Sequence, residues 1–291
     1  MTVTRRKFLG TAAAGAVAAA AAPAEARERR ALPPDAEGLL YDSTLCIGCR
    51  ACVTKCKEAN KLPADVRLLD GVAYDAPEDL NASTKTVIKL WADEKGERSA
   101  FIKRQCMHCI DPACVTACMI KAFQKGPKGV ITYEASRCLG DRYCQIACPF
   151  NVPKFEWSKA FPVMVKCELC RHRKEGPACS EVCPRDAVIS GKVTELKAIA
   201  HRRIDANPGR YNPRVFGETE AGGTQCLYLA PAGVEFEQLG FPKLDERPIP
   251  EMAVTIQHGI YYGGILPVVG FVGLGLVVSR NRKKAEKEGT K

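Results

Sequence analysis

The sequence lacks the motifs by which many enzyme families bind and convert a substrate. It contains no phosphate-binding glycine loop, no nucleophile elbow and no HExxH zinc motif. Histidine, a common metal ligand and general base, occurs only four times in 291 residues. No substrate pocket is indicated, so we expect a protein that makes and breaks no substrate bonds on its own.

A charge pattern typical of nucleic-acid binding is also missing. The net charge is +10, but the segment 280–291 contributes +4 of it, from six Lys or Arg against two Glu. Residues 1–26 contribute a further +2, from three basic residues against one acidic residue. About +4 is left for the rest of the chain. That excess is too small to predict a nucleic-acid partner.

Cysteine, by contrast, is abundant and strongly patterned. The first and third of four cysteine groups follow the C-x2-C-x2-C-x3-C run of bacterial ferredoxins, with Asp141 in the second slot of the third group. The other two groups lengthen the middle gap of the same run. The groups are Cys46, Cys49, Cys52 and Cys56; Cys106, Cys109, Cys114 and Cys118; Cys138, Cys144 and Cys148; and Cys167, Cys170, Cys179 and Cys183.

This spacing suits cubane iron–sulfur clusters. Three thiolates two residues apart wrap one face of a cluster, and a fourth begins a helix that leads away. In two-cluster ferredoxins that fourth cysteine binds the neighbouring cluster, so runs pair, and four runs indicate two ferredoxin-like units with four clusters. Zinc sites use two separated pairs, and a chain of 291 residues needs no disulfide framework, so both alternatives fit less well.

Three further residues are interpreted from their places relative to these groups. Cys226 lies outside all four and is expected to be a small, buried apolar residue. His108 and His172 lie inside cysteine loops. We expect them to shield or hydrogen-bond a cluster sulfur rather than to bind iron.

The two ends predict export and anchoring. Residues 1–26 are typical of a twin-arginine signal, with Arg5 and Arg6 before a soft apolar run and small residues at its end. Residues 259–279 contain no charge over 21 positions, enough for a transmembrane helix across a core of about 30 Å, with a buried core helix as the alternative. The basic segment 280–291 then predicts a cytoplasmic tail, which places the main domain on the periplasmic side of the inner membrane.

Between the ends we expect an α+β fold made of two ferredoxin-like 4Fe-4S units with inserted hairpins. Residues 27–42 are charged and proline-bearing and are interpreted as a linker. Residues 43–250 are interpreted as the double ferredoxin-like iron–sulfur domain.

A few local elements are also predicted within this domain. Segments 86–91 and 99–103 flank a glycine-containing turn and predict a hairpin. Residues 129–133 predict a short strand. Residues 192–206 predict a helix that ends at Asn207-Pro208-Gly209, whereas the proline-rich segments that follow are expected to be mostly loop.

Over residues 40–235 the chain resembles the four-cluster ferredoxin-like electron-transfer subunits of membrane-bound oxidoreductases. With its signal and anchor, it is most similar to the iron–sulfur subunits of hydrogenase-2, the HybA type. The resemblance rests on Cys-Ile-Gly-Cys-Arg-Ala-Cys at 46–52, Cys-Met-His-Cys at 106–109, Arg-Tyr-Cys-Gln-Ile-Ala-Cys-Pro-Phe at 142–150 and Lys-Cys-Glu-Leu-Cys-Arg-His-Arg at 166–173.

In that family the first and fourth groups share one unit, and the second and third share the other. Carried over to this chain, the resemblance implies four ligand sets: Cys46, Cys49, Cys52 and Cys183 for the first cluster; Cys167, Cys170, Cys179 and Cys56 for the second; Cys106, Cys109, Cys114 and Cys148 for the third; and Cys138, Cys144 and Cys118, with Asp141 as a candidate further ligand, for the fourth.

Asp141 departs from the family pattern and leaves two forms of the fourth cluster open. Either the labile iron is lost and a [3Fe-4S] cluster remains, or the carboxylate holds the fourth iron. We favour the three-iron form because oxygen donors hold this iron less firmly than thiolates. The expected cofactors are three [4Fe-4S] clusters plus one [3Fe-4S] or Asp-ligated [4Fe-4S] cluster.

The function that the resemblance implies is electron transport. The chain would be the iron–sulfur subunit of a membrane-bound periplasmic uptake [NiFe] hydrogenase and no enzyme on its own. Its implied partners are the hydrogenase small and large subunits, an integral membrane quinone-reactive subunit and the membrane itself. The alternative is the equivalent subunit of a molybdopterin oxidoreductase or of a cytochrome-linked reductase.

Overall fold

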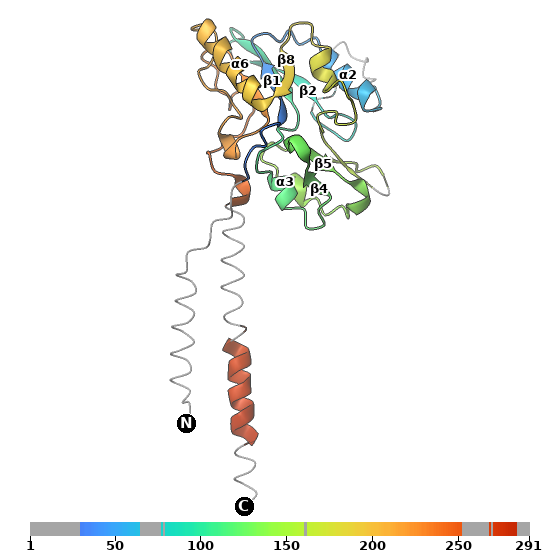
Figure 1. Cartoon of the computed structure of the whole chain (residues 1–291), viewed down its shortest axis with the longest axis vertical. Helices are drawn as coiled ribbons and strands as arrows, with labels where there is room; N and C mark the ends of the chain where they lie inside the picture. The colour runs from blue at the N-terminus through green and yellow to red at the C-terminus, as the bar shows by residue number, and fades with distance from the viewer. Residues whose placement is uncertain are drawn as a thin grey trace, which may run out of the picture. The chain divides into compact units, whose positions relative to one another are not determined.

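The structure, a computed structural model, describes residues 30–64, 77, 79–159, 162–251, 268 and 270–283. The chain divides into two compact units (Figure 1). Arg29–Pro250 forms the larger unit, which contains every cysteine. Met1–Glu28 and Glu251–Lys291 form the other, in which residues 270–283 are helical.

The larger unit is organised around a three-stranded sheet in the order β8-β1-β9. Strand β1 (Glu37–Asp42) pairs antiparallel with β8 (Val188–Lys192) and parallel with β9 (Cys226–Leu229). The register sets Leu40 opposite Ile189 on one side and Leu227 on the other. Segments from the beginning, middle and end of the unit therefore meet in one sheet.

The two faces of this sheet face different cores, because side chains alternate along a strand. Leu39 and Tyr41 of β1 belong to the large core that also contains many of the cysteines. Leu40, between them, packs with Leu227 and with Leu196 of α6 (Val193–Ala206). Helix α6 thus covers the face turned away from the cysteines (Figure 1).

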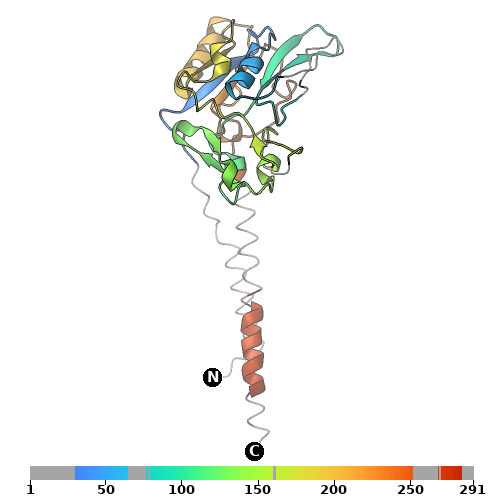
Figure 2. The same ribbon diagram turned by 90° about the vertical axis from the view of Figure 1, so that its right-hand side faces the viewer.

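Three hairpins make up the rest of the β structure: β2 (Val87–Ala92) with β3 (Ser99–Arg104), β4 (Phe123–Lys125) with β5 (Ile131–Tyr133), and β6 (Lys154–Phe155) with β7 (Met164–Val165). The first hairpin reaches out beside α2, while β4 and β5 lie below the sheet (Figure 2). Short 3₁₀ turns occur at Pro127–Gly129, Ala135–Arg137 and Glu220–Gly222.

Four short helices carry cysteines from the four groups: α2 (Ala51–Ala59), α3 (Ala113–Thr116), α4 (Tyr143–Ile146) and α5 (Ala178–Glu181). Helix α2 packs against α5, and α3 packs against α4. The first group therefore adjoins the fourth and the second adjoins the third. This is the pairing expected of two ferredoxin-like units, and the α+β class is confirmed.

Two of the three local predictions match these elements, and the third differs in length. The hairpin over 86–91 and 99–103 is confirmed, as is the helix over 192–206. The strand expected at 129–133 is shorter, because residues 127–129 form a 3₁₀ turn before β5.

The linker over residues 27–42 and the loop after residue 208 each contain a strand that the sequence reasoning missed. Glu37–Asp42 is β1, and it is buried on both faces over five of its six residues. Cys226–Leu229 is β9, buried at every position. Both strands are too short to show a clear alternation, and proline and charge nearby obscured them.

The predicted signal, residues 1–26, lies outside the described residues, and so does the beginning of the predicted transmembrane helix over 259–279. Within the part of the chain that the structure describes, no helix is both long enough and apolar enough to span a membrane.

Candidate iron–sulfur sites

The first site lies at the start of α2. Cys46, Cys49, Cys52 and Cys183 line one cavity with an empty volume of about 350 Å³. Gly48 has φ 70°, a left-handed conformation that glycine adopts freely, and its N–H donates to Cys46 Sγ at 3.4 Å. Cys49 is exposed, so the first site opens to the surface.

The second site joins the last turn of α2 to the fourth cysteine group. Cys56, Cys167, Cys170 and Cys179 line a second cavity, of about 330 Å³. The N–H of Leu169 donates to Cys167 Sγ at 3.4 Å. All four thiols are buried, so this site is shielded from water.

The third site is formed next to α3 and α4. Burial, followed by the charges of Cys148, Cys114 and Cys106, raises the pKa of the Cys109 thiol well above its ordinary value. Burial, followed by the charges of Cys106 and Cys148, also raises the pKa of Cys114. Burial raises the pKa of Cys148 to about 11. These mutual effects mean that the four sulfurs lie close together.

The fourth site gathers Cys118, Cys138 and Cys144. Burial, followed by the charges of Cys118, Cys138 and Asp141, raises the pKa of the Cys144 thiol to about 12. The N–H of Ala122 donates to Cys118 Sγ at 3.2 Å. Asp141 is exposed and interacts electrostatically with Cys144. It takes the second slot of the third cysteine group, where the ferredoxin run has a ligand.

These donor sets fit iron–sulfur clusters. Burial raises the pKa of Cys52 to about 12 and that of Cys56 to about 11, because an isolated thiolate is poorly solvated there. Iron bound to the sulfurs supplies the positive charge that keeps buried thiolates deprotonated. Soft sulfur donors, with no carboxylate in three of the four sets, match the ligand preference of such clusters.

The cysteines are arranged neither as disulfides nor around single ions. All sixteen are free thiols. Over the described ranges, no three or more His, Cys, Asp or Glu side chains close around one metal ion. The ligands of a cluster surround several iron atoms and are spread more widely than those of one ion.

Packing of α2 against α5 and of α3 against α4 brings the first site beside the second and the third beside the fourth. Neighbouring sites are connected by pairs of cysteines that interact electrostatically: Cys52 with Cys179, Cys167 with Cys106, and Cys114 with Cys144. The first and fourth sites are therefore the two ends of a row.

Cys226 belongs to none of the four sites. It is fully buried in β9, where its thiol donates to the carbonyl of Cys106 at 3.3 Å. The amide of Gln105 donates to its sulfur at 3.5 Å. The prediction of a small buried residue is confirmed.

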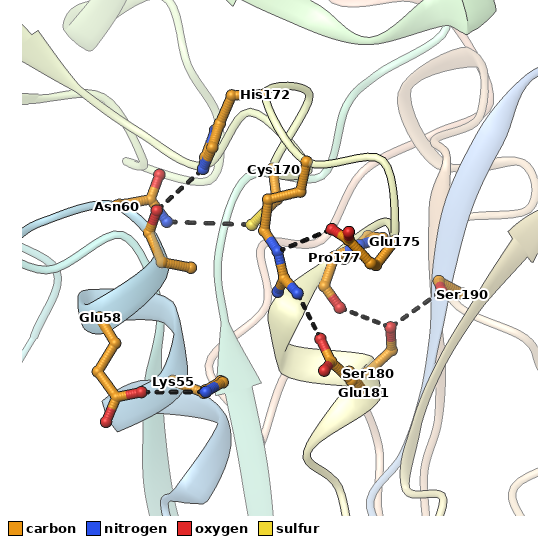
Figure 3. A network of polar contacts seen from close by, with 12 residues as sticks. Lys55, Glu58, Asn60, Cys170, His172, Glu175, Pro177, Ser180, Glu181 and Ser190 are labelled. Atoms are coloured by element: carbon orange, nitrogen blue, oxygen red, sulfur yellow. Dashed lines mark hydrogen bonds and ion pairs between the residues drawn. The ribbon is translucent and has the colours of Figure 1, made fainter.

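The two loop histidines differ in their surroundings. His108 is fully buried, and its Nδ1 accepts a hydrogen bond from the N–H of Ile131 at 3.1 Å. Burial, followed by the charges of Lys166 and Lys125, lowers the pKa of His108 well below its ordinary value. His172 is exposed, and its Nε2 donates to the carbonyl of Ala59 at 2.9 Å (Figure 3).

Sequence reasoning missed the polar residues that surround the second site, Asn60, Lys85 and Lys103. The amide of Asn60 contacts the sulfur of Cys170, which lies 110 residues further along the chain. Lys103 is fully buried although its strand reads as an ordinary hairpin strand. No spacing in the sequence signals contacts of this range.

Comparison with known proteins also points to iron–sulfur clusters. Residues 98–193 match the family described as a 4Fe-4S dicluster domain. The chain is 38% identical to the "Hydrogenase-2 operon protein HybA" of Escherichia coli O157:H7, over 99% of this chain and 98% of that protein. It is 34% identical to the "Formate dehydrogenase, nitrate-inducible, iron-sulfur subunit" of Escherichia coli K12, over 65% of this chain and 66% of that protein.

Proposed function

This chain belongs to the family of the hydrogenase-2 operon protein HybA, and from that premise we propose that it is the electron-transfer iron–sulfur subunit of a membrane-bound [NiFe] hydrogenase. It is not catalytic by itself. It relays electrons from the small and large hydrogenase subunits to an integral membrane subunit that reduces quinone.

The observation that carries this proposal is the row of four cysteine sites. When bound, clusters at these sites supply one-electron oxidation and reduction without making or breaking substrate bonds. The chain holds the thiolates of each site, keeps water from the second site, and sets neighbouring sites side by side. A row with two ends suits a relay between two partners.

Exposed apolar side chains at both ends of the row support docking of partners there. Ile47, beside Cys46 of the first site, is 55% exposed. Around the fourth site, Met119, Leu139 and Ile146 are 77%, 81% and 79% exposed. Large exposed apolar side chains gathered near one site favour protein contacts. We assign the first end to the hydrogenase small subunit and the fourth end to the integral membrane subunit.

The same function requires a particular location. We propose that residues 1–26 are a twin-arginine signal that directs export of the protein. Residues 259–279 are proposed to form a transmembrane anchor, and residues 280–291 a cytoplasmic tail. The iron–sulfur domain then stands on the periplasmic side of the inner membrane. Tagging the tail and labelling it from either side of spheroplasts tests this orientation.

The test of the function is to solubilise the native complex in mild detergent and to identify what co-purifies. A nickel-containing large subunit supports the hydrogenase assignment. Reduction of the iron–sulfur signals by hydrogen in that preparation, and not by formate, strengthens it.

A second candidate is the equivalent subunit of a formate dehydrogenase, a molybdopterin oxidoreductase. It is favoured by the 34% identity to the formate dehydrogenase iron–sulfur subunit. That similarity covers 65% of this chain, whereas the hydrogenase-2 similarity covers 99%. Co-purification of a molybdenum enzyme would decide for this candidate.

A further inference from the structure

The second cavity differs from the first in the groups that line it besides cysteine. The first cavity is lined mostly by apolar side chains such as Ile88 and Val188, together with two arginines and Tyr41. The hydroxyl of Tyr41 donates to the carbonyl of Phe101 at 2.7 Å.

The second cavity is lined by five residues with hydrogen-bonding side chains, Asn60, Lys85, Thr86, Gln105 and Glu168. The carboxylate of Glu168 is paired with Arg171 at 3.4 Å and accepts from the N–H of Tyr133 at 2.9 Å. Such groups can give the sulfurs of a buried site hydrogen bonds and charge interactions that apolar side chains do not provide.

Asn60 turns its amide nitrogen toward the sulfurs of the second site. Its Nδ2 donates to the carbonyl of Cys56 at 2.8 Å and lies 3.6 Å from Cys56 Sγ. It also lies 3.9 Å from Cys170 Sγ (Figure 3). A side-chain amide has two N–H groups, so it can serve the carbonyl and a sulfur together.

Lys85 fixes this orientation of the amide. Its Nζ lies 2.9 Å from Asn60 Oδ1. An ammonium group only donates hydrogen bonds, so the amide oxygen must face Lys85 and the amide nitrogen must face the sulfurs. Lys85 therefore orients Asn60 and adds a positive charge to the same side of the cavity.

Lys103 places a second positive charge next to the residues that line the cavity. It is fully buried, and its Nζ donates to Thr86 Oγ1 and to Gln105 Oε1, two atoms of residues that line the cavity. Lys103 also interacts electrostatically with Cys179, Cys167 and Cys56 of the second site.

We propose that the oriented Lys85–Asn60 pair and the buried Lys103 raise the reduction potential of the second site above the value that its four cysteines alone would give. Reduction adds one electron, and so one negative charge, to the site, with no bond made or broken. Hydrogen bonds to sulfur and nearby cations stabilise that charge, more strongly where water is excluded. The inference rests on the proposed function, since it requires a cluster at this site.

The test is a redox titration of the hydrogenase complex followed by EPR, with the second-site signal identified by its loss in a Cys170→Ser variant. Asn60→Leu removes the donor at similar size, and Lys85→Met removes the group that orients it. We expect the second-site midpoint potential to shift downward in both, and in Lys103→Met, while the third- and fourth-site potentials stay unchanged. Lys85→Arg keeps a positively charged side chain that only donates hydrogen bonds, so this variant should have the wild-type potential.

Lys55→Met is the matched control, because Lys55 lies on helix α2, which ends next to Asn60, and its side chain is 40% exposed and pairs with Glu58 at 3.2 Å. An unchanged second-site potential in Asn60→Leu, relative to Lys55→Met, overturns the inference, as does an upward shift. If Lys103→Met loses iron, Asn60→Leu and Lys85→Met still decide the question. Absence of any iron–sulfur signal in the wild-type complex would instead overturn the proposed function.

Discussion

Asp141 is the residue at which the fourth site departs from the other three. Its side chain offers oxygen where the ferredoxin run has sulfur, and it is exposed beside Cys118, Cys138 and Cys144. An exposed oxygen ligand competes poorly with water for iron. The fourth site is therefore the one at which an iron atom is most easily lost.

We predict that Asp141→Cys converts the fourth site from three irons to four. The oxidised wild-type protein should show a three-iron EPR signal and contain about fifteen irons, whereas the variant should lose that signal and contain about sixteen, as expected for complete cubane ligation. Asp141→Asn is the control, since it removes the charge without adding sulfur. A wild-type protein that is EPR-silent when oxidised and already contains sixteen irons would show that Asp141 binds iron.

Cys226 is a buried packing residue, whereas the other fifteen cysteines belong to the four groups. We predict that Cys226→Ala keeps the iron content and every EPR signal, and lowers the free energy of unfolding by about 1–2 kcal/mol through its lost contacts with Gln105 and Cys106. Cys114→Ala, an equally conservative change at a third-site cysteine, should lose iron. Iron analysis and thermal unfolding measure both outcomes, and iron loss in Cys226→Ala would contradict this assignment.

At the scale of elements, strand β1 ties the cysteine-bearing core to helix α6. The buried carboxylate of Asp42 at its end accepts from Arg203 at 2.9 Å and from Tyr211 at 3.0 Å. Leu39 and Leu40 pack into the two cores on opposite faces of the sheet. Disturbing β1 should therefore affect both the core and the helix.

We predict that Gly38→Ala destabilises the larger unit by about 2–4 kcal/mol. A Cβ at this position would lie 1.9 Å from the carbonyl oxygen of Gln225, to which Leu39 donates, so β1 and β9 would have to move apart. Gly191→Ala in β8 is the matched control, since its nearest contact would be 3.8 Å. Thermal unfolding compares the two, and equal stability would show that the sheet accommodates the methyl group.

At the scale of the whole molecule, the two ends of the site row differ in their surroundings. The first end opens through one exposed cysteine, Cys49. The fourth end is surrounded by the exposed side chains Met119, Leu139 and Ile146. Under the proposed function these are the entry and exit surfaces.

We predict that Ile146→Glu lowers hydrogen-driven quinone reduction about tenfold or more, because a carboxylate buried at the interface costs at least ~1.4 kcal/mol. The iron content should be unchanged. Hydrogen-driven reduction of a soluble dye that takes its electrons directly from the hydrogenase small and large subunits should also be unchanged. Leu90→Glu in the β2–β3 hairpin, at 51% exposure, is the control (Figure 2). Equal loss in both variants would show that the surface around Ile146 is not a specific docking site.

The cysteine groups, the β2–β3 hairpin and helix α6 could be predicted because each depends on residues close together in the chain. Strands β1 and β9 could not, since each is short and gains its stability from pairing with partners more than 140 residues away, Val188 for Tyr41 and Leu227 for Leu40 among them. The surroundings of Lys103 were missed because Cys52 and Cys179, which act on it, belong to separate cysteine groups of the chain.

The sequence by itself determined which donors exist, how many groups they form and where sulfur gives way to the oxygen of Asp141, because ligand spacing within a loop is a local property. Only the tertiary structure decided the order of the four sites, which ends of the row reach the surface and which side chains surround the second site. Those features depend on packing between distant segments, such as Asn60 against Cys170, and packing is decided by the whole fold.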